Sequence, residues 1–321
     1  MSKGLRIIFM GTPEFAQGVL QQILESNHQV LAVVTAPDRP AGRGQKIKKS
    51  AVKAYSELQD IEVLQPVKFK EDGFIEKLKS YEADLFVVVA FRMLPQAVWS
   101  LPQKGTINLH ASLLPNYRGA APINWAIING ESYTGVTTFF INENIDTGDI
   151  IQNKKVNISE NMNVGELHDV LLDVGSKLVV TTLDAIEIAP IVPQKQAAIN
   201  EKSHKHAPKI FKEDCKIDWS LNSAEVHNKI RGLSPYPGSW CTLSNQTKGT
   251  KVKFKLFSSK ITDQVCKERK IALKSDAEGI LFPCHDRYLC IDELQMEGKR
   301  RMTFKEFLAG NTIEEFELIL E

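Results

Sequence analysis

The chain has 321 residues, of which 43% are hydrophobic and 25% are charged, and its formal net charge is +1. This length is enough for two domains, and the composition excludes a disordered or collagen-like chain. No apolar run approaches the ~18 residues of a membrane span, and Leu5–Met10 is too short for a signal peptide. The cysteines are odd in number, five, and form no CxxC pair, so we expect reduced thiols in a cytoplasmic protein and no metal.

Short apolar strands alternate with helical segments over the first 110 residues. We expect strands at Leu5–Met10, Val30–Thr35, Ile61–Leu64, Leu85–Ala90 and Thr106–His110. We expect helices at Pro13–Glu25, Lys48–Leu58 and Asp72–Tyr81, the first with Thr12 as its N-cap. Alternating strands and helices favour a parallel sheet with helices on both faces. The sequence therefore predicts an α/β fold whose N-terminal part is a doubly wound, mostly parallel, Rossmann-like sheet.

The pattern changes after residue 110. We expect a short helix at Ala120–Ile128 and two longer strands at Thr134–Ile141 and Asp149–Ile158. We also expect a long amphipathic helix at Val164–Ile186, with Val170 on its apolar face. The polar residues that follow have no clear period and are interpreted as a linker. From about Ile210, short β-like runs, turn signals such as SPYPGSW and a closing helix near Phe304–Leu308 predict a small, OB-like β-barrel. The expected domains are 1–189, a linker at 190–208, and 209–321.

Two polar side chains stand at the end of the last predicted N-terminal strand. Asn108 and His110 are two residues apart, so both side chains leave the same face of that strand. Ligands gather at the carboxyl ends of parallel strands, where an amide donor and an imidazole can hold an oxyanion. Taken alone, the pair also fits a structural Asn and a core His. The run SLLP that follows either presents main-chain groups to a flat heterocycle or is a simple strand-to-loop turn.

A third polar element is DTG at Asp146–Gly148, between the two longer strands. An acid followed by Thr-Gly allows a tight turn that turns the carboxylate outward. Alone, DTG also fits an ordinary Asx turn. An aspartic-protease site would need a second carboxylate in a matching context, and the flanking pattern here does not provide one.

Basic residues concentrate in two segments that contain no acid between their ends. The first comprises Arg39, Arg43, Lys46, Lys48, Lys49 and Lys53, and the second comprises Lys248, Lys251, Lys253, Lys255 and Lys260. Such runs are commonly solvated faces, but two of them in a nearly neutral chain predict a one-sided positive field. Lys251, Lys253 and Lys255 alternate with apolar residues, which places three ammonium groups on one face of a predicted strand.

Three motifs together resemble the folate-dependent formyltransferases. They are NLHASLLPNYRGAAPINWAIING, TGVTTFF and IDTGDI. In that family an Asn, a His and an Asp form the catalytic set, which the resemblance carries onto Asn108, His110 and Asp146. The segments LRIIFMGTPEFA, APDRPAGRG, KIDWS and IRGLSPYPGSW resemble the members of the family that act on methionyl-tRNA. One departure is VAFRMLP, in which Arg92 is bulky and puts the shape of the folate pocket in doubt.

The resemblance implies a reaction and its partners. The formyl donor is 10-formyltetrahydrofolate, and the acceptor is the α-amine of methionine esterified to initiator tRNA. The implied folate-binding residues are Val89, Phe91, Ser112, Leu113, Leu114 and Pro115. Phe15 would line the pocket for the methionine-bearing end, or else pack in the core. The implied RNA-binding cations are Arg39, Arg43, Lys46, Lys251, Lys253 and Lys255. We expect a monomer that needs no metal and no membrane.

The implied mechanism assigns the developing oxyanion to Asn108 and His110. His110 returns a proton to the leaving folate nitrogen, while Asp146 orients the imidazole and helps to remove the amine proton. Whether His110 or Asp146 is the base stays open. Two alternatives also remain, a formyltransferase that acts on an amino-sugar nucleotide and an inactive RNA- or folate-binding homologue. A nicotinamide enzyme fits less well, because GTPEF is no GxGxxG fingerprint.

Overall fold

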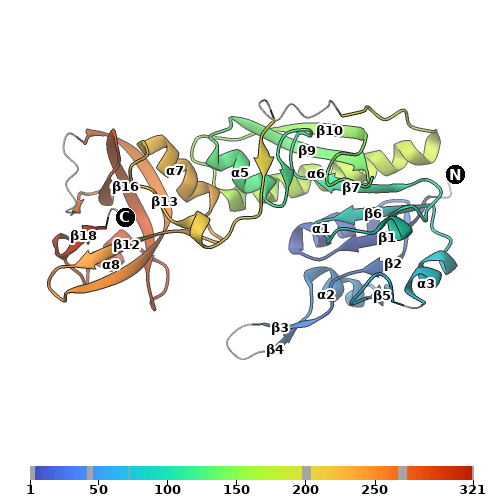
Figure 1. The fold of residues 1–321 in the computed structure, drawn as a ribbon, viewed down its shortest axis with the longest axis horizontal. Coiled ribbons are helices and arrows are strands. Elements are labelled where there is room, and N and C mark those ends of the chain that lie inside the picture. The colour runs from blue at the N-terminus through green and yellow to red at the C-terminus, as the bar shows by residue number, and fades with distance from the viewer. Residues whose placement is uncertain (1–3, 42–45, 72, 197–203, 267–272, 320–321) are drawn as a thin grey trace. The chain divides into compact units, whose positions relative to one another are not determined.

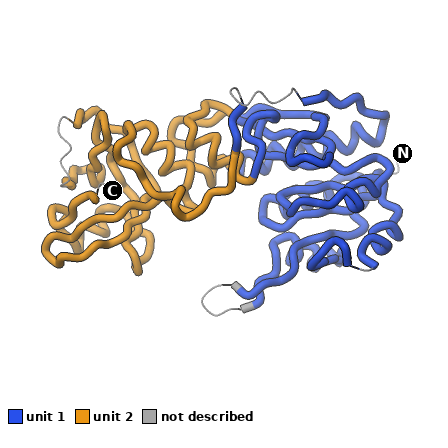
Figure 2. The backbone as a smooth tube through the Cα atoms, in the orientation of Figure 1, with its two compact units in different colours: residues 1–119, 134–156, 168–206 blue, residues 120–133, 157–167, 207–321 orange. Residues whose placement is uncertain are grey.

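The computed structural model describes residues 4–41, 46–71, 73–196, 204–266 and 273–319. The chain forms two compact units, which Figure 2 shows in different colours. Unit 1 contains residues 1–119, 134–156 and 168–206, and unit 2 contains residues 120–133, 157–167 and 207–321. The two inserted segments therefore pack with the C-terminal part of the chain, whereas the domain boundaries expected from the sequence remain a prediction. No helix of the described residues is both long enough and apolar enough to cross a membrane.

Unit 1 is built on one sheet with the strand order β10-β9-β7-β6-β1-β2-β5. Its strands are β1 (Arg6–Gly11), β2 (Gln29–Val34), β5 (Val63–Leu64), β6 (Leu85–Val89), β7 (Thr106–His110), β9 (Tyr133–Phe140) and β10 (Ile150–Asn157). The strands from β5 to β7 run parallel, and β9 runs antiparallel to β7. All residues of β6 are buried, as its continuous apolar sequence requires in a sheet covered on both sides. The predicted mostly parallel sheet is confirmed.

Helices cover both faces of this sheet (Figure 1). They are α1 (Glu14–Leu24), α2 (Ala51–Leu58), α3 (Phe74–Ser80), α4 (Gln96–Trp99) and α6 (Val164–Ile188). On one face, α3 and α4 share a core with β1 and β6 that includes Ile8, Phe86 and Leu78. On the other face, a Cβ added at Gly175 of α6 would lie 3.0 Å from the Leu109 side chain of β7. The doubly wound arrangement therefore holds.

Three local expectations are wrong. Helix α1 begins at Glu14 after an extended Pro13, with no side-chain cap, so Thr12 is not its N-cap. Helix α2 begins only at Ala51, because the Ser50 hydroxyl caps it by accepting from the Lys53 amide. The preceding residues form instead a small hairpin of β3 (Arg39–Ala41) and β4 (Lys46–Lys48). On α6, Val170 lies 38% exposed rather than on the buried face.

Unit 2 contains a curled antiparallel sheet with the order β14-β15-β16-β13-β12-β18. Its strands are β12 (Ser239–Asn245), β13 (Thr250–Val265), β14 (Lys274–Ser275), β15 (Ile280–Pro283), β16 (Arg287–Met296), β17 (Met302–Thr303, paired with β16) and β18 (Phe316–Leu318). Near the two ends of this order, the Leu273 amide donates to the Phe316 carbonyl at 3.5 Å. The sheet is therefore a half-barrel whose edges approach each other, in line with the predicted barrel.

Aromatic side chains fill the half-barrel. Trp219 stacks on Phe282 with ring centroids 4.9 Å apart, and Phe254, Phe307 and Phe316 meet edge to face or tilted. The helices of this unit are α5 (Pro122–Ile128), α7 (Ser223–Gly232) and α8 (Phe304–Leu308), with short 3₁₀ turns at Glu213–Cys215 and Ile313–Glu315. The predicted closing helix is confirmed at α8. Strands β8 (Arg118–Gly119) and β11 (His206–Ala207) lie where the chain passes from one unit to the other.

Helices α5 and α7 pack closely inside unit 2. A Cβ added at Gly232 would lie 2.7 Å from the Ile128 side chain, so this glycine permits the approach of the two helices. The Asn124 side-chain amide donates to the Gly232 carbonyl at 2.8 Å. These contacts explain why α5, which comes from the middle of the chain, belongs to the C-terminal unit.

Candidate active site

Asn108 and His110 lie on one face of β7, as their spacing predicts. Asn108 pairs in register with Val88 of β6 and with Phe139 of β9. Leu109, which lies between them in sequence, faces α6 on the opposite side of the sheet. His110 is only 6% exposed and Asn108 is half-buried. The strand therefore holds an amide and an imidazole side by side at the carboxyl end of the parallel sheet.

A backbone carbonyl fixes the orientation of the His110 ring. The Nε2 atom of His110 lies 2.8 Å from the carbonyl oxygen of Tyr117. Because a carbonyl oxygen only accepts, Nε2 carries the hydrogen and donates it. Nδ1 then faces the Asp146 carboxylate, with 3.7 Å between Nδ1 and Oδ2. This separation exceeds a direct hydrogen bond and leaves Nδ1 as the ring nitrogen that can exchange a proton.

Asp146 reaches His110 from the loop between β9 and β10. Its carboxylate is 12% exposed and accepts from the Gly119 amide at 2.9 Å. The expectation that DTG turns the carboxylate outward is wrong, because Asp146 adopts a φ of 55° and its side chain points inward. Gly148 lets the loop close, since a Cβ there would lie 1.6 Å from the Phe140 carbonyl oxygen.

The Asn108 amide oxygen is buried and has no hydrogen-bond partner in the described part of the chain. Leaving such an atom unpaired costs about 1–3 kcal/mol, so an orphan of this kind calls for an explanation. A hydrogen-bond donor on a substrate would satisfy it. The role of Asn108 in binding remains a prediction.

The residues of the SLLP run are largely tied into the protein. The Ser112 hydroxyl donates to the Asn116 carbonyl at 2.6 Å, and the Leu114 amide donates to the Thr137 hydroxyl at 3.2 Å. Leu114 is buried in a small apolar cluster, while Leu113 and Pro115 are half-buried. Leu113 and Pro115 are therefore the members with surface left for a ligand, and the folate contact of this run remains a prediction.

The Arg92 side chain, just after the end of β6, makes several contacts with neighbouring residues. Its guanidinium stacks over the Phe69 ring at 4.0 Å and donates to the carbonyl oxygens of Pro66 and Val67. Burial lowers the pKa of Arg92 from its ordinary value. Phe91 is half-buried against Phe69, and Val89 is fully buried. These contacts account for the side chain of Arg92, and the contact of Val89 and Phe91 with folate remains a prediction.

Phe15 sits at the start of α1 and is 7% exposed. Its ring meets the His168 ring edge to face, with centroids 5.3 Å apart. This is the core packing that the sequence allowed as an alternative. A role for Phe15 in holding methionine remains a prediction.

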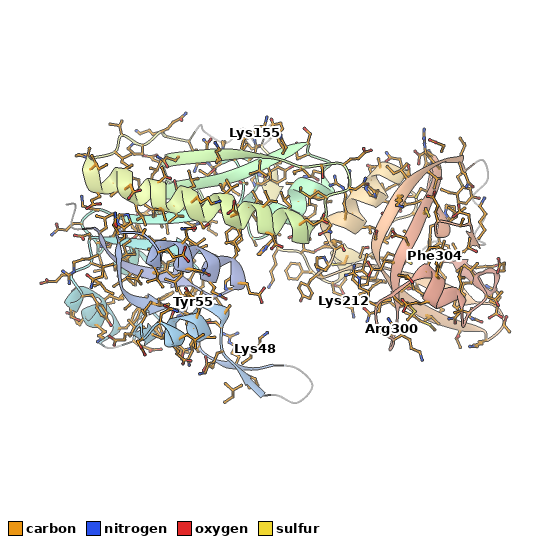
Figure 3. All side chains as sticks on the ribbon, turned by 180° about the vertical axis from the view of Figure 1, so that it is seen from behind. Lys48, Tyr55, Lys155, Lys212, Arg300 and Phe304 are labelled. Carbon is orange, nitrogen blue, oxygen red and sulfur yellow. The ribbon has the colours of Figure 1, made fainter. Side chains whose placement is uncertain are left out.

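The first basic segment is partly neutralised by its own neighbours. The ammonium group of Lys53 lies 2.6 Å from the Asp38 carboxylate, and that of Lys49 lies 2.6 Å from Glu57. Arg39 and Lys48 pair across the β3–β4 hairpin and are exposed; Figure 3 labels Lys48 there. Arg43 and the side chain of Lys46 lie outside the described residues.

The second basic segment follows β13 as expected, with buried Phe254 between Lys253 and Lys255. The Lys253 ammonium lies 3.7 Å from the Trp240 ring centroid, and Lys255 donates to the Pro237 carbonyl at 2.7 Å. Lys251 is exposed. The three cations therefore share a face of the sheet with an aromatic ring, which is a combination that RNA-binding surfaces use.

Three groups at the site escaped the sequence analysis. The Tyr117 carbonyl and the Gly119 amide lie in the NYRGA run, and no sequence pattern marks these main-chain groups. Gln196 contacts the DTG loop from within the segment interpreted as a linker. No periodicity or motif marks Gln196, so the sequence alone carries no signal for it.

One group of potential metal ligands occurs among the described residues, formed by His28, Asp184 and Glu187. The Nδ1 atom of His28 accepts from the Leu5 amide at 3.1 Å, so its Nε2 carries the hydrogen. Nε2 lies 3.2 Å from the carboxylate of Asp184. A protonated nitrogen cannot ligate a metal, and the arrangement is better explained as a contact between the buried His28 and the exposed Asp184.

Comparisons with known proteins agree with this geometry. The family model of the formyl transferases matches residues 5–183, and that of the formyl transferase C-terminal domain matches residues 209–312. The chain is 49% identical to the methionyl-tRNA formyltransferase of Flavobacterium johnsoniae, over 96% of each chain. It is 46% identical to that of Bacteroides thetaiotaomicron, over 95% of each chain. The chain therefore belongs to the formyl transferase family, and within it to the group of the methionyl-tRNA formyltransferases.

Solved structures share the fold at low sequence identity. HypX from Aquifex aeolicus, in complex with tetrahydrofolic acid, matches with a TM-score of 0.64 at 18% identity, over 95% of this chain and 47% of that one. An N-formyltransferase from Helicobacter canadensis, in complex with folinic acid and dTDP-3-aminofucose, matches with a TM-score of 0.61 at 21% identity. That match covers 94% of this chain and 100% of the other. These likenesses concern the fold.

Proposed function

We propose that the chain transfers the formyl group of 10-formyltetrahydrofolate to the α-amine of methionine carried by initiator tRNA. The observation that carries the chemistry is the set of three groups at the end of β7. Asn108 offers a side-chain amide whose oxygen is unpaired in the described residues, and His110 Nδ1 faces Asp146 across 3.7 Å. The choice of acceptor is supported by relatives that are 42–49% identical over nearly the whole chain.

Each of the three groups has a defined role in the proposed reaction. The amine nitrogen attacks the formyl carbon, and the side-chain nitrogen of Asn108 donates to the resulting oxyanion. The unpaired Asn108 oxygen accepts from the attacking amine. The amine proton passes to the pair of His110 and Asp146, whose 3.7 Å gap is too wide for a direct bond. The bond to the folate nitrogen then breaks, that nitrogen takes a proton, and the products are the formylated amine and tetrahydrofolate.

His110 exchanges its proton through Nδ1, because Nε2–H is already donated to the Tyr117 carbonyl. That bond keeps the ring oriented. The Asp146 carboxylate stabilises a charged imidazole next to it. The step balances whether the amine proton moves first to His110 or to Asp146.

The decisive experiment offers labelled 10-formyltetrahydrofolate together with a panel of acceptors. The panel contains charged initiator tRNA, charged elongator tRNA and an amino-sugar nucleotide. We expect label on initiator methionyl-tRNA and much less on the elongator. Label on the sugar alone would overturn the proposed acceptor while leaving the chemistry in place. Absence of transfer to every acceptor would identify a binding protein without turnover.

A further inference from the structure

One side chain from the segment after β10 and α6 fixes the backbone on both sides of Thr147. The Nε2 atom of Gln196 donates to the carbonyl oxygens of Asp146 and Gly148, at 3.0 and 2.7 Å. Both hydrogens of this amide are therefore used on the loop that carries the catalytic carboxylate. A single group thus holds the main chain immediately before and after Thr147.

Arg118 fixes which way the Gln196 amide points. Nε and Nη2 of Arg118 both donate to Gln196 Oε1. A guanidinium has only donors, so the oxygen of the amide must face it and the nitrogen must face the loop. Arg118 is 8% exposed; burial lowers its pKa, and the nearby Asp146 carboxylate counteracts this effect. We call the two hydrogen bonds from Gln196 to the Asp146 and Gly148 carbonyls the clamp. Arg118, which supports the clamp, is therefore a buried cation in a defined position.

The rest of the loop offers few other ties to the body of unit 1. Residues 142–145 are exposed, and within the described residues the Thr147 hydroxyl bonds inside the loop, to Asn142 and Asn144. Asp146 has a φ of 55°, which an aspartate adopts only where its surroundings hold it. The Asp146 carboxylate itself accepts from the Gly119 amide at 2.9 Å. The distance between His110 and Asp146 therefore depends on a loop that Gln196 anchors.

We propose that Gln196 is a positioning residue for formyl transfer, acting through Asp146 with Arg118 as its support. This inference rests on the proposed function, since it assigns the clamp to the same reaction. Gln196 touches no reacting atom and acts only on the carbonyl oxygens of the loop. A misplacement of about 1 Å in a reacting group costs about 100-fold in rate, so the clamp contributes to kcat rather than to substrate affinity.

The sharpest test replaces one atom. Gln196→Glu keeps an oxygen for Arg118 but places a second oxygen against the carbonyls of Asp146 and Gly148. Gln194→Glu is the matched control, because Gln194 is exposed and bridges Ile150 through its backbone alone. We expect kcat of Gln196→Glu to fall about 100-fold with KM for folate and for tRNA changed less than about threefold, and Gln194→Glu to behave as wild type. Equal kcat values for the two variants would overturn the proposal.

A double-mutant cycle separates positioning from general structural damage. Once Asp146→Asn has removed the carboxylate, Gln196→Glu should cost less than about twofold more, because the two residues act as a unit. A full additional loss in the Asp146→Asn background would also overturn the proposal. Gln196→Met, which keeps the length and loses both polar atoms, replaces Gln196→Glu if thermal unfolding shows that the latter does not fold. An inactive wild type would count against the proposed function, not against the clamp.

Discussion

At the scale of single residues, Asn108 combines a buried unpaired oxygen with a position at the end of β7. A buried unsatisfied group calls for an explanation, and a ligand that completes it is one. Asn108→Ala should lower turnover by about 100- to 1,000-fold, the usual cost of losing one oxyanion donor. The same change removes the unpaired atom, so the melting temperature should stay equal or rise. Single-turnover formyl transfer and calorimetry measure both quantities, and near-normal turnover would refute the assignment.

Asn108 and His110 were predictable as neighbours because a strand has a period of two residues. The inward direction of Asp146 was not predictable, because it depends on a left-handed φ that the tripeptide DTG does not specify. Gln196 was hidden for a different reason. Its contacts join positions about 50 residues apart, and no local pattern encodes such a pairing. Residue identities near the chemistry could be inferred from the sequence, whereas the groups that orient them could not.

At the scale of elements, the loop between β9 and β10 depends on Gly148. A Cβ there would lie 1.6 Å from a backbone oxygen of β9, so the loop must move. Gly148→Ala should reduce kcat by about 100-fold, through displacement of Asp146 by an ångström or more. Gly310→Ala is the control, because a Cβ at Gly310 meets nothing within 4 Å. Steady-state kinetics of both variants measures kcat. A wild-type kcat for Gly148→Ala would show that the loop tolerates the shift and would contradict the prediction.

Strands and helices of unit 1 were predictable where burial leaves a pattern in the sequence, a continuous apolar run in β6 and a helical period in α6. The β3–β4 hairpin was missed because its Pro-, Gly- and Lys-rich sequence has no alternation of apolar and polar residues. The start of α2 was misplaced because Ser50 competes with Lys48 as the first residue, and the cap decides the boundary. The assignment of α5 to unit 2 depends on its packing with α7, which no local sequence reveals.

The half-barrel of unit 2 should lose stability in alkali. Burial raises the pKa of the Cys241 and Cys284 thiols to about 12, from an ordinary value of 9.0. In the folded chain both remain neutral, whereas in the unfolded chain they ionise above pH 9 and draw the equilibrium toward unfolding. Stability should therefore be complete below pH 9 and fall as the pH rises toward 12. Urea midpoints between pH 8 and 10.5 measure this loss.

The cysteine variants provide the control for that alkaline loss. The double variant Cys241→Ala with Cys284→Ala should show a flatter dependence on pH, whatever its stability at neutral pH. Cys266→Ala, which removes a half-exposed thiol, should keep the wild-type slope. If all three proteins lose stability in parallel, groups other than Cys241 and Cys284 control the loss of stability in alkali.

At the scale of the whole molecule, both units carry exposed cations although the net charge is only +1. Arg39 lies in unit 1 and Lys251 in unit 2, and both are exposed. Each phosphate contact contributes about one unit to the slope of log affinity against log salt. If RNA contacts the two units through separate phosphates, the effects of Arg39→Ala and Lys251→Ala should add.

The double variant Arg39→Ala with Lys251→Ala should therefore lower the salt slope for initiator tRNA by about two units. Lys49→Ala is the matched control of equal charge change, because the Lys49 ammonium is already 2.6 Å from Glu57 and hydrogen bonding to that carboxylate raises its pKa. Filter binding from 50 to 200 mM salt measures the slopes. A slope unchanged in the double variant would remove the support for a tRNA surface that spans both units. A loss with Lys49→Ala as large as with Arg39→Ala would show that only overall charge matters, since a paired ammonium has less to offer a phosphate than an exposed guanidinium.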